Sequence, residues 1–233
     1  MTRAPAPVQG ADDVRLKQAC VALGLSATDE QLSKLLGYLQ LLQRWNRTYN
    51  LTAIRDPGQM LVQHIFDSLA VVGPLDGVMP ADGKLFDIGA GAGLPGVILA
   101  IMRPGWKIVC IDAVEKKTAF IRQAAGALAL PNLSVLHERV EKLPPGACDV
   151  VTSRAFASLD DFARLAGQHV APGGTLLALK GKVPDDEIAR LHAAGEWRVV
   201  RIDPVTVPEL DAQRCLIWMR RDGARSQGNH ESN

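Results

Sequence analysis

Hydrophobic residues recur at two different spacings along this chain, and the change falls near residue 84. Before that point they recur every three or four positions, which is the spacing of one face of a helix. Thr28 and Gln31 form a capping-box pair, and the leucines after them predict an amphipathic helix that weakens near Trp45. We therefore expect a helical N-terminal extension over residues 1–78, packed on the rest of the chain.

A second helix of the extension carries signals at both ends. Asp56 can cap a helix start, and Pro57 suits the first helical position because the N–H that proline lacks would be unpaired there. The sequence predicts this helix over residues 60–72 and predicts that Gly73-Pro74 ends it.

From residue 84 on, short apolar runs alternate with helical patterns. This alternation predicts parallel strands joined by crossover helices. The last two apolar runs have no helical pattern between them, which predicts a terminal hairpin and one antiparallel strand in the sheet. The expected strands are 84–88, 107–112, 133–137, 149–153, 174–180, 197–202 and 215–220, with helices near 95–103, 115–129, 158–170 and 184–194.

Length and composition narrow the class of protein. The 233 residues suffice for one core with a small appendage, and the formal net charge of +1 gives no support for a nucleic-acid partner. The four cysteines lack metal-ligand spacing, which predicts a reduced, metal-free protein. Residues 1–10 lack the apolar core of a signal peptide, and the apolar runs are too short to cross a membrane. We expect a cytoplasmic monomer.

A glycine-rich turn joins the first two expected strands. Gly91 to Gly96 matches the dinucleotide pattern G-x-G-x-x-G, and Asp112 ends the next strand about 20 residues farther on. A dehydrogenase is therefore one alternative. Asp87 favours another cofactor, because a carboxylate at the end of the first strand would repel a pyrophosphate and attract the ammonium group of a methionine moiety.

Two further features favour S-adenosylmethionine as the cofactor. The terminal strand pair is typical of the seven-stranded methyltransferase sheet, and Ala171-Pro172-Gly173-Gly174 resembles the turn that enters its fifth strand. We therefore predict an α/β fold over residues 79–221: a doubly wound, Rossmann-like, seven-stranded sheet of the S-adenosylmethionine-dependent methyltransferase kind. Asp112 is expected to accept hydrogen bonds from the ribose hydroxyls. Residues 222–233 are polar and are expected to form a disordered tail.

The end of the fourth expected strand bears on the methyl acceptor. Pyrimidine carbons usually need a cysteine nucleophile, and exocyclic adenine nitrogens usually need an Asn/Asp-Pro-Pro-aromatic sequence; residues 152–156 have neither. Arg154 stands there, and a guanidinium cannot act as a base. Guanine N7 needs no base, so Arg154 is predicted to be catalytic through positioning, by contacting guanine or phosphate. The alternative is an arginine that only pairs with a neighbouring carboxylate.

Basic residues gather near the carboxyl ends of the expected strands, where open sheets bind ligands. The candidates for contact with RNA are Arg122, Arg139 and Lys180. In the extension, Arg44, Arg47 and Arg55 stand around Trp45 and Tyr49. This mixture is compatible with RNA and equally with a solvated helix face.

Several blocks of the sequence resemble the RsmG (GidB) family of bacterial 16S ribosomal RNA guanine-N7 methyltransferases. They include Asn50-Leu51-Thr52 and Ser153-Arg154-Ala155-Phe156-Ala157, and the resemblance extends from about residue 15 to 220. It implies methylation of the guanosine at position 527 of 16S ribosomal RNA, within the small ribosomal subunit or an assembly intermediate. It also implies cofactor contacts at Gly89, Leu94, Val140, Glu141 and Arg154, in addition to Asp87, Gly91 and Asp112.

Three questions stay open from the sequence. His64 and Asp67, one helical turn apart, can shape a substrate loop or brace the extension against the sheet. A small-molecule methyltransferase with the same core is an alternative, because the charge is nearly neutral. A cofactor-binding module without catalytic activity is another.

Overall fold

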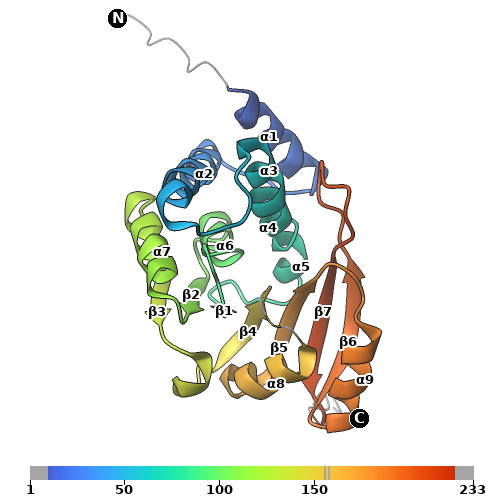
Figure 1. Ribbon diagram of the computed structural model, residues 1–233. Helices are drawn as coiled ribbons and strands as arrows, with labels where there is room; N and C mark the ends of the chain where they lie inside the picture. The colour runs from blue at the N-terminus through green and yellow to red at the C-terminus, as the bar shows by residue number, and fades with distance from the viewer. Residues whose placement is uncertain (1–9, 155, 157, 224–233) are drawn as a thin grey trace, which may run out of the picture.

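The core of the protein is a seven-stranded sheet (Figure 1). The computed structural model describes residues 10–154, 156 and 158–223. The strands are β1 (Lys84–Ile88), β2 (Lys107–Asp112), β3 (Leu133–His137), β4 (Cys148–Ser153), β5 (Val170–Lys180), β6 (Trp197–Pro204) and β7 (Cys215–Arg221), in the order β3-β2-β1-β4-β5-β7-β6. β1 to β5 are parallel, and β7 is antiparallel to both β5 and β6. The predicted doubly wound sheet and its terminal hairpin are confirmed.

Helices cover both faces of the sheet (Figure 1). They are α6 (Gly96–Met102), α7 (Glu115–Ala127), α8 (Leu159–Ala166) and α9 (Asp185–Ala194), with 3₁₀ turns η2 (Val140–Lys142) and η3 (Gly167–His169). Leu85 of β1 packs with the extension, α6 and α7, whereas its neighbour Phe86 packs with α8. The alternation arises because successive strand residues point to opposite faces, and both faces are buried here.

The extension is helical, as predicted, and its elements pack on the α6 side of the sheet (Figure 1). They are α1 (Ala11–Ala22), α2 (Asp29–Tyr49), α3 (Pro57–Met60), the π-helical segment η1 (Leu61–Phe66), α4 (Asp67–Leu69) and α5 (Val72–Asp76). The capping box of Thr28 and Gln31 is present. α2 does not weaken at Trp45, because this ring packs on Phe120 of α7 with centroids 5.6 Å apart.

Two predicted boundaries were wrong. Gly73-Pro74 was expected to end the helix, but the helix ends at Leu69 and both residues lie in the first turn of α5. Proline is tolerated in a first turn, since its missing N–H would have no partner there. Residues 171–174 were expected to form a turn, but they belong to β5, whose register against β4 shifts between Cys148 and Val150.

Side chains of the extension bond directly to the elements that carry the glycine loop. Tyr38 of α2, which is fully buried, donates its hydroxyl hydrogen to Ala92 O at 2.6 Å. Gln31 donates to Ile101 O and Met102 O, the last carbonyls of α6, at 3.1 Å each. The extension therefore positions the loop that precedes α6.

Two predictions from the sequence concerned membrane-spanning segments and the C-terminal tail. Among the described residues, no helix is both long and apolar enough to span a membrane. The backbone N–H of Asp222, just after β7, donates to Glu196 O at 2.8 Å. The rest of the tail expected over 222–233 lies, from residue 224 on, outside the described residues.

Candidate active site

Two cavities meet at Gly89, at the carboxyl ends of the parallel strands. The first cavity, of about 410 Å³, is lined by Gly89–Ala92, Leu94, Leu51, Thr52, Gln63, His64, Asp67, Val71, Arg154, Leu179–Gly181, Val205 and Arg214–Leu216. The second cavity, of about 300 Å³, is lined by Ile88, Gly89, Ile111–Ala113, Glu138–Glu141, Phe156 and Leu165. Open α/β sheets bind ligands in this place.

The glycine loop between β1 and α6 folds against the end of β2. Gly89 N and Ala90 N donate to Ile111 O at 2.8 and 3.1 Å. Gly91 has a φ of +61°, a left-handed conformation that favours glycine, and its N–H donates to Asp112 Oδ2 at 2.9 Å. The loop thus presents its backbone to both cavities.

Asp112 is held in place by backbone donors at both carboxylate oxygens. Besides the bond from Gly91, its Oδ1 accepts from Val114 N at 2.9 Å. The side chain is almost buried, yet it lines the second cavity. A carboxylate oxygen can accept more than one hydrogen bond, so Asp112 retains acceptor capacity toward a ligand hydroxyl.

Asp87 lies behind the loop. Its side chain is completely buried, and it is not among the described residues that line either cavity. Oδ2 accepts from Gly96 N at 2.8 Å, and Oδ1 has no hydrogen-bond partner among the described residues. Burial raises the pKa of Asp87 to about 7. The structure therefore shows Asp87 supporting the start of α6, and its contact with an amino group stays a prediction.

The second cavity brings together three residues that the family resemblance or the basic cluster singled out. Arg139, Val140 and Glu141 follow β3, and Val140 is buried. His169 of η3 contacts the carbonyl of Val140 at 3.0 Å through Nε2, which fixes the backbone there. Glu141 is half-exposed and lies 4.0 Å from Arg139 Nη1.

The first cavity contains a carboxylate between two arginines. Asp67 Oδ2 accepts from Arg154 Nη1 at 3.2 Å, and Oδ1 accepts from Arg214 Nε at 2.7 Å. Arg154 follows β4, Asp67 begins α4, and Arg214 precedes β7. Arg154 thus pairs with a carboxylate and also lines the cavity, and its contact with guanine or phosphate stays a prediction.

His64 forms part of the wall beside this cluster. Its Nε2 lies 3.0 Å from Thr52 Oγ1, and its Nδ1 lies 3.2 Å from Gln63 O. Burial, with the charge of Arg154 second, lowers the pKa of His64 to about 4. His64 is therefore neutral at pH 7 and adds no charge to the cavity.

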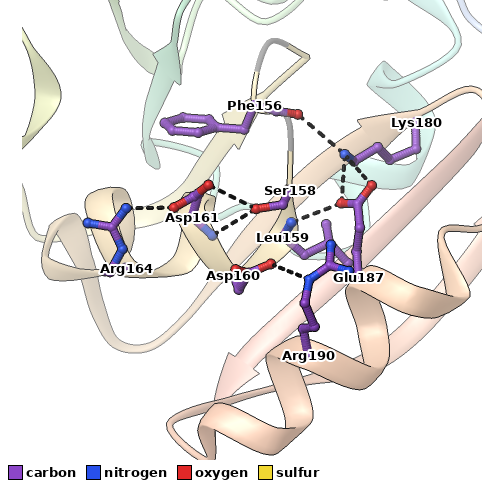
Figure 2. Close-up of polar contacts among 9 residues, drawn as sticks. All are labelled: Phe156, Ser158, Leu159, Asp160, Asp161, Arg164, Lys180, Glu187 and Arg190. Carbon is purple, nitrogen blue, oxygen red and sulfur yellow. Dashed lines mark hydrogen bonds and ion pairs between the residues drawn. The ribbon is translucent and has the colours of Figure 1, made fainter.

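Lys180 also lines the first cavity, but it is held by neighbours, as Figure 2 shows. Its Nζ donates to Glu187 Oε2 of α9 at 2.9 Å and to Phe156 O at 3.3 Å. Glu187 in turn accepts from Leu159 N at 2.9 Å. Lys180 thus braces the segment between Arg154 and α8. Arg122 is exposed on α7 and is not among the described residues that line either cavity.

The chain matches the family model described as GidB, rRNA small subunit methyltransferase G, over residues 31–217. It is 65% identical to the Ribosomal RNA small subunit methyltransferase G of Bordetella pertussis, over 95% of this chain and 97% of that protein. It is 52% identical to the protein of the same name from Leptothrix cholodnii, over 85% of this chain and 91% of that protein. The chain belongs to the rRNA small subunit methyltransferase G family. The prediction of a methyltransferase is confirmed, and the dehydrogenase alternative is excluded.

Solved structures agree on the fold. A SAM-dependent methyltransferase from Aquifex aeolicus superposes with a TM-score of 0.54 at 20% identity, over 70% of this chain and 93% of that chain. One from Thiobacillus denitrificans, in complex with S-adenosyl-L-homocysteine, gives a TM-score of 0.51 at 13% identity, over 66% and 90%. At these identities the likeness shows the fold alone.

Arg214 is the cavity residue that sequence reasoning missed. It stands outside the recognised motifs, in the connection before β7, and only the pairing of β7 with β5 brings it to the cavity. One signal was available: the last strand of the predicted hairpin begins at the carboxyl end of β5. Charged residues at that start were therefore candidates. Residues 155 and 157 of the Ser153–Ala157 block lie outside the described residues.

Proposed function

We propose that this protein transfers the methyl group of S-adenosylmethionine to N7 of a guanosine in 16S ribosomal RNA, at position 527 of that RNA. The observation that carries this proposal is the family match, which spans residues 31–217 and with them every described residue that lines the two cavities. The choice of N7 is supported by Arg154, a cation that cannot act as a base at the end of β4.

The residues present suit this methyl donor. Asp112 would accept from the ribose hydroxyls, and Val140 and Phe156 offer apolar surface for the adenine in the second cavity. The methionine part would lie along the left-handed loop at Gly89 and Gly91, where a missing side chain lets the backbone approach. Arg154, beside it in the first cavity, would attract the carboxylate of the methionine part or the acceptor.

Methyl transfer to guanine N7 requires that the base be positioned against the methyl donor, and it does not require that a proton be removed from the base. When bound, the donor supplies a methyl carbon that is activated by its attachment to a sulfonium. The N7 lone pair forms a bond to this carbon as the carbon–sulfur bond breaks, and the electron pair stays with sulfur. No proton moves in this step. Arg154, Asp67 and Arg214 would orient the base, and orientation alone can lower such a barrier by about 7 to 11 kcal/mol.

The cavity also argues against a pyrimidine carbon as the acceptor. That reaction needs a thiolate nucleophile. Cys215 lines the first cavity, but burial raises the pKa of its thiol, so it is protonated at neutral pH. A guanine ring nitrogen makes no such demand.

The test offers donor with a radiolabelled methyl group and small ribosomal subunits from a strain that lacks the modification. The RNA is then digested, and the labelled nucleoside is separated. Label in 7-methylguanosine supports the proposal, and cleavage at reduced 7-methylguanosine followed by primer extension tests position 527. Label in another methylguanosine contradicts the choice of N7.

Two alternatives correspond to other outcomes of this experiment. A small-molecule methyltransferase with the same core would leave the RNA unlabelled. A cofactor-binding module would bind the donor tightly and transfer nothing to any ribosomal substrate. The cytoplasmic location, the monomeric state and the domain boundaries at residues 78 and 221 stay predictions.

A further inference from the structure

Three cations without carboxylate partners among the described residues lie near the end of α2, where Tyr49 is exposed. Most of the described lysines and arginines lie within 4 Å of a carboxylate, and Arg47, Arg55 and Lys116 are among the nine that do not. All three are exposed, as is Tyr49, whose exposed fraction is 45%. We call Arg47, Tyr49, Arg55 and Lys116 the basic rim.

Hydrogen bonds connect Lys116 and Arg55 of the basic rim to the end of α2. Lys116 of α7 donates from Nζ to Tyr49 O at 3.0 Å, at the last residue of α2. Arg55 donates from Nη2 to Asn50 Oδ1 at 2.9 Å. The connecting loop is itself fixed by Asn46, which accepts from Thr52 N at 2.9 Å and donates to Ile54 O at 3.0 Å.

The ring of Tyr49 packs against another aromatic ring of α2. Its centroid lies 4.9 Å from that of Trp45, and Trp45 packs on Phe120. Such a stack restrains an exposed aromatic ring with little further loss of side-chain freedom on binding. Aromatic rings of this kind are used to stack unpaired bases of RNA, and the nearby cations hold the phosphates.

The basic rim adjoins, along the chain, residues that line the first cavity. Leu51 and Thr52, the second and third residues after Tyr49, line that cavity. Enzymes that act on a base either flip it out of a duplex or take it from a single strand, and in a single strand the neighbouring bases are also free to stack on a protein side chain. Two acidic residues flank the rim in sequence, Asp56 and Glu115, and Asp56 Oδ1 is engaged by Gln59 N.

We infer that the basic rim binds the single-stranded RNA next to the target guanosine, with one base stacked on Tyr49 and phosphates held by Arg47, Arg55 and Lys116. This inference rests on the proposed function, because it names the surface that grips the same RNA. It also explains how a chain with a formal charge of only +1 attracts a polyanion: the cations are placed locally and left unpaired.

The experiment measures methyl transfer to unmodified small subunits with the full chain and three variants. Tyr49→Ala should raise KM for the subunit about tenfold, because it removes the ring on which a base stacks. Tyr49→Phe keeps the ring and should stay within about twofold of wild type. Lys116→Ala should raise KM and reduce its dependence on salt. The Kd for S-adenosylmethionine, from calorimetry, should be unchanged in all three.

Lys107→Ala is the matched control. Lys107 is exposed and begins β2, at the opposite end of the sheet from the cavities. Its KM and salt dependence should equal those of wild type. Binding of an unstructured oligoribonucleotide, followed by fluorescence anisotropy, separates RNA from ribosomal protein as the partner. It should weaken in Tyr49→Ala and not in Tyr49→Phe.

The outcomes are distinguishable. Wild-type transfer to RNA with an unchanged KM in Tyr49→Ala overturns the inference and leaves the proposed function standing. An equal loss in Tyr49→Phe also overturns it, because the hydroxyl and not the ring would then matter. A raised KM with unchanged oligoribonucleotide binding shows a protein contact in place of RNA. No transfer by the wild type overturns both.

Discussion

The carboxylate of Asp67 accepts a hydrogen bond from Arg214 Nε at 2.7 Å, between residues 147 positions apart in the sequence. The other oxygen of the same carboxylate accepts from Arg154 at 3.2 Å. The helical extension thus contributes the group that orients two cations supplied by the sheet. It is part of the active site as much as of the packing, because both arginines line the first cavity.

Asp67→Asn should weaken both the fold and the reaction. The amide keeps the shape but loses the charge, and two partly buried guanidiniums then lack a carboxylate. We expect the free energy of unfolding in urea to fall by about 1 to 3 kcal/mol. We expect the rate constant of methyl transfer, measured in a single turnover, to fall at least tenfold. Asp76→Asn is the control. Asp76 pairs with Arg103, but its side chain is more exposed than that of Asp67, so the loss of its charge should cost less. Equal losses in the two variants would contradict an orienting role for Asp67.

Arg154→Ala should strongly reduce methylation while the protein stays folded. Asp67 keeps Arg214 as its partner, so the buried carboxylate is not left unpaired. Loss of a group that positions the reacting base should lower kcat by about a hundredfold or more. Circular dichroism and single-turnover transfer check the two halves of this prediction. Near-normal turnover would remove Arg154 from the catalytic role.

The pH dependence of stability should reveal Asp87. Burial raises its pKa to about 7, above the ordinary value of 3.8, so the folded protein binds a proton that the unfolded chain releases between these values. Its contribution is complete below about pH 4 and is lost as the pH rises through about 7. The contribution amounts to about 4 kcal/mol at most.

Asp87→Asn should remove this loss, because the amide does not ionise and its oxygen can still accept from Gly96 N. His64 acts in the opposite direction: its pKa is lowered to about 4, so it favours unfolding as the pH falls below 6.5. The prediction therefore concerns the difference between variant and wild type. Urea unfolding of the ligand-free protein from pH 5 to 8 measures it. Parallel curves for the two proteins would refute the assignment.

Gly93 should be intolerant of any side chain. Its φ is +84°, and a Cβ there would lie 2.5 Å from Val97 Cγ2 and 3.2 Å from Ile121 Cγ1. Left-handed strain and overpacking together predict a loss of about 2 to 4 kcal/mol for Gly93→Ala. Gly73→Ala is the control, because a Cβ at that helical position meets nothing within 4 Å. Thermal unfolding compares the two, and a similar midpoint for both would contradict the prediction.

β1, β2 and β3 could be predicted to the residue, β4 within one residue and β5 within four, because these strands read as apolar runs between turns. The glycine loop and Asp112 followed from the same local pattern. Contacts between distant segments could not be predicted. Arg214 reaches Asp67 only through the order of the sheet, and the π-helical turn over Leu61–Phe66 depends on how the extension packs. The burial of Asp87 also depends on the packed loop, which the position at a strand end does not reveal.

Replacing Gln31 should lower the free energy of unfolding more than replacing Thr28, its partner in the capping box. Its Oε1 accepts from Thr28 N at 2.9 Å, while its Nε2 donates to the last two carbonyls of α6. Thr28→Ala loses one cap bond and should cost about 1 kcal/mol. Gln31→Ala also leaves two carbonyls of α6 without this donor and should cost about 1 kcal/mol more. Gln31→Glu separates the two contributions, because it keeps the acceptor for Thr28 N and loses the donors. Unfolding in urea should therefore rank Gln31→Ala and Gln31→Glu below Thr28→Ala, and the reverse order would mean that the cap alone holds α2.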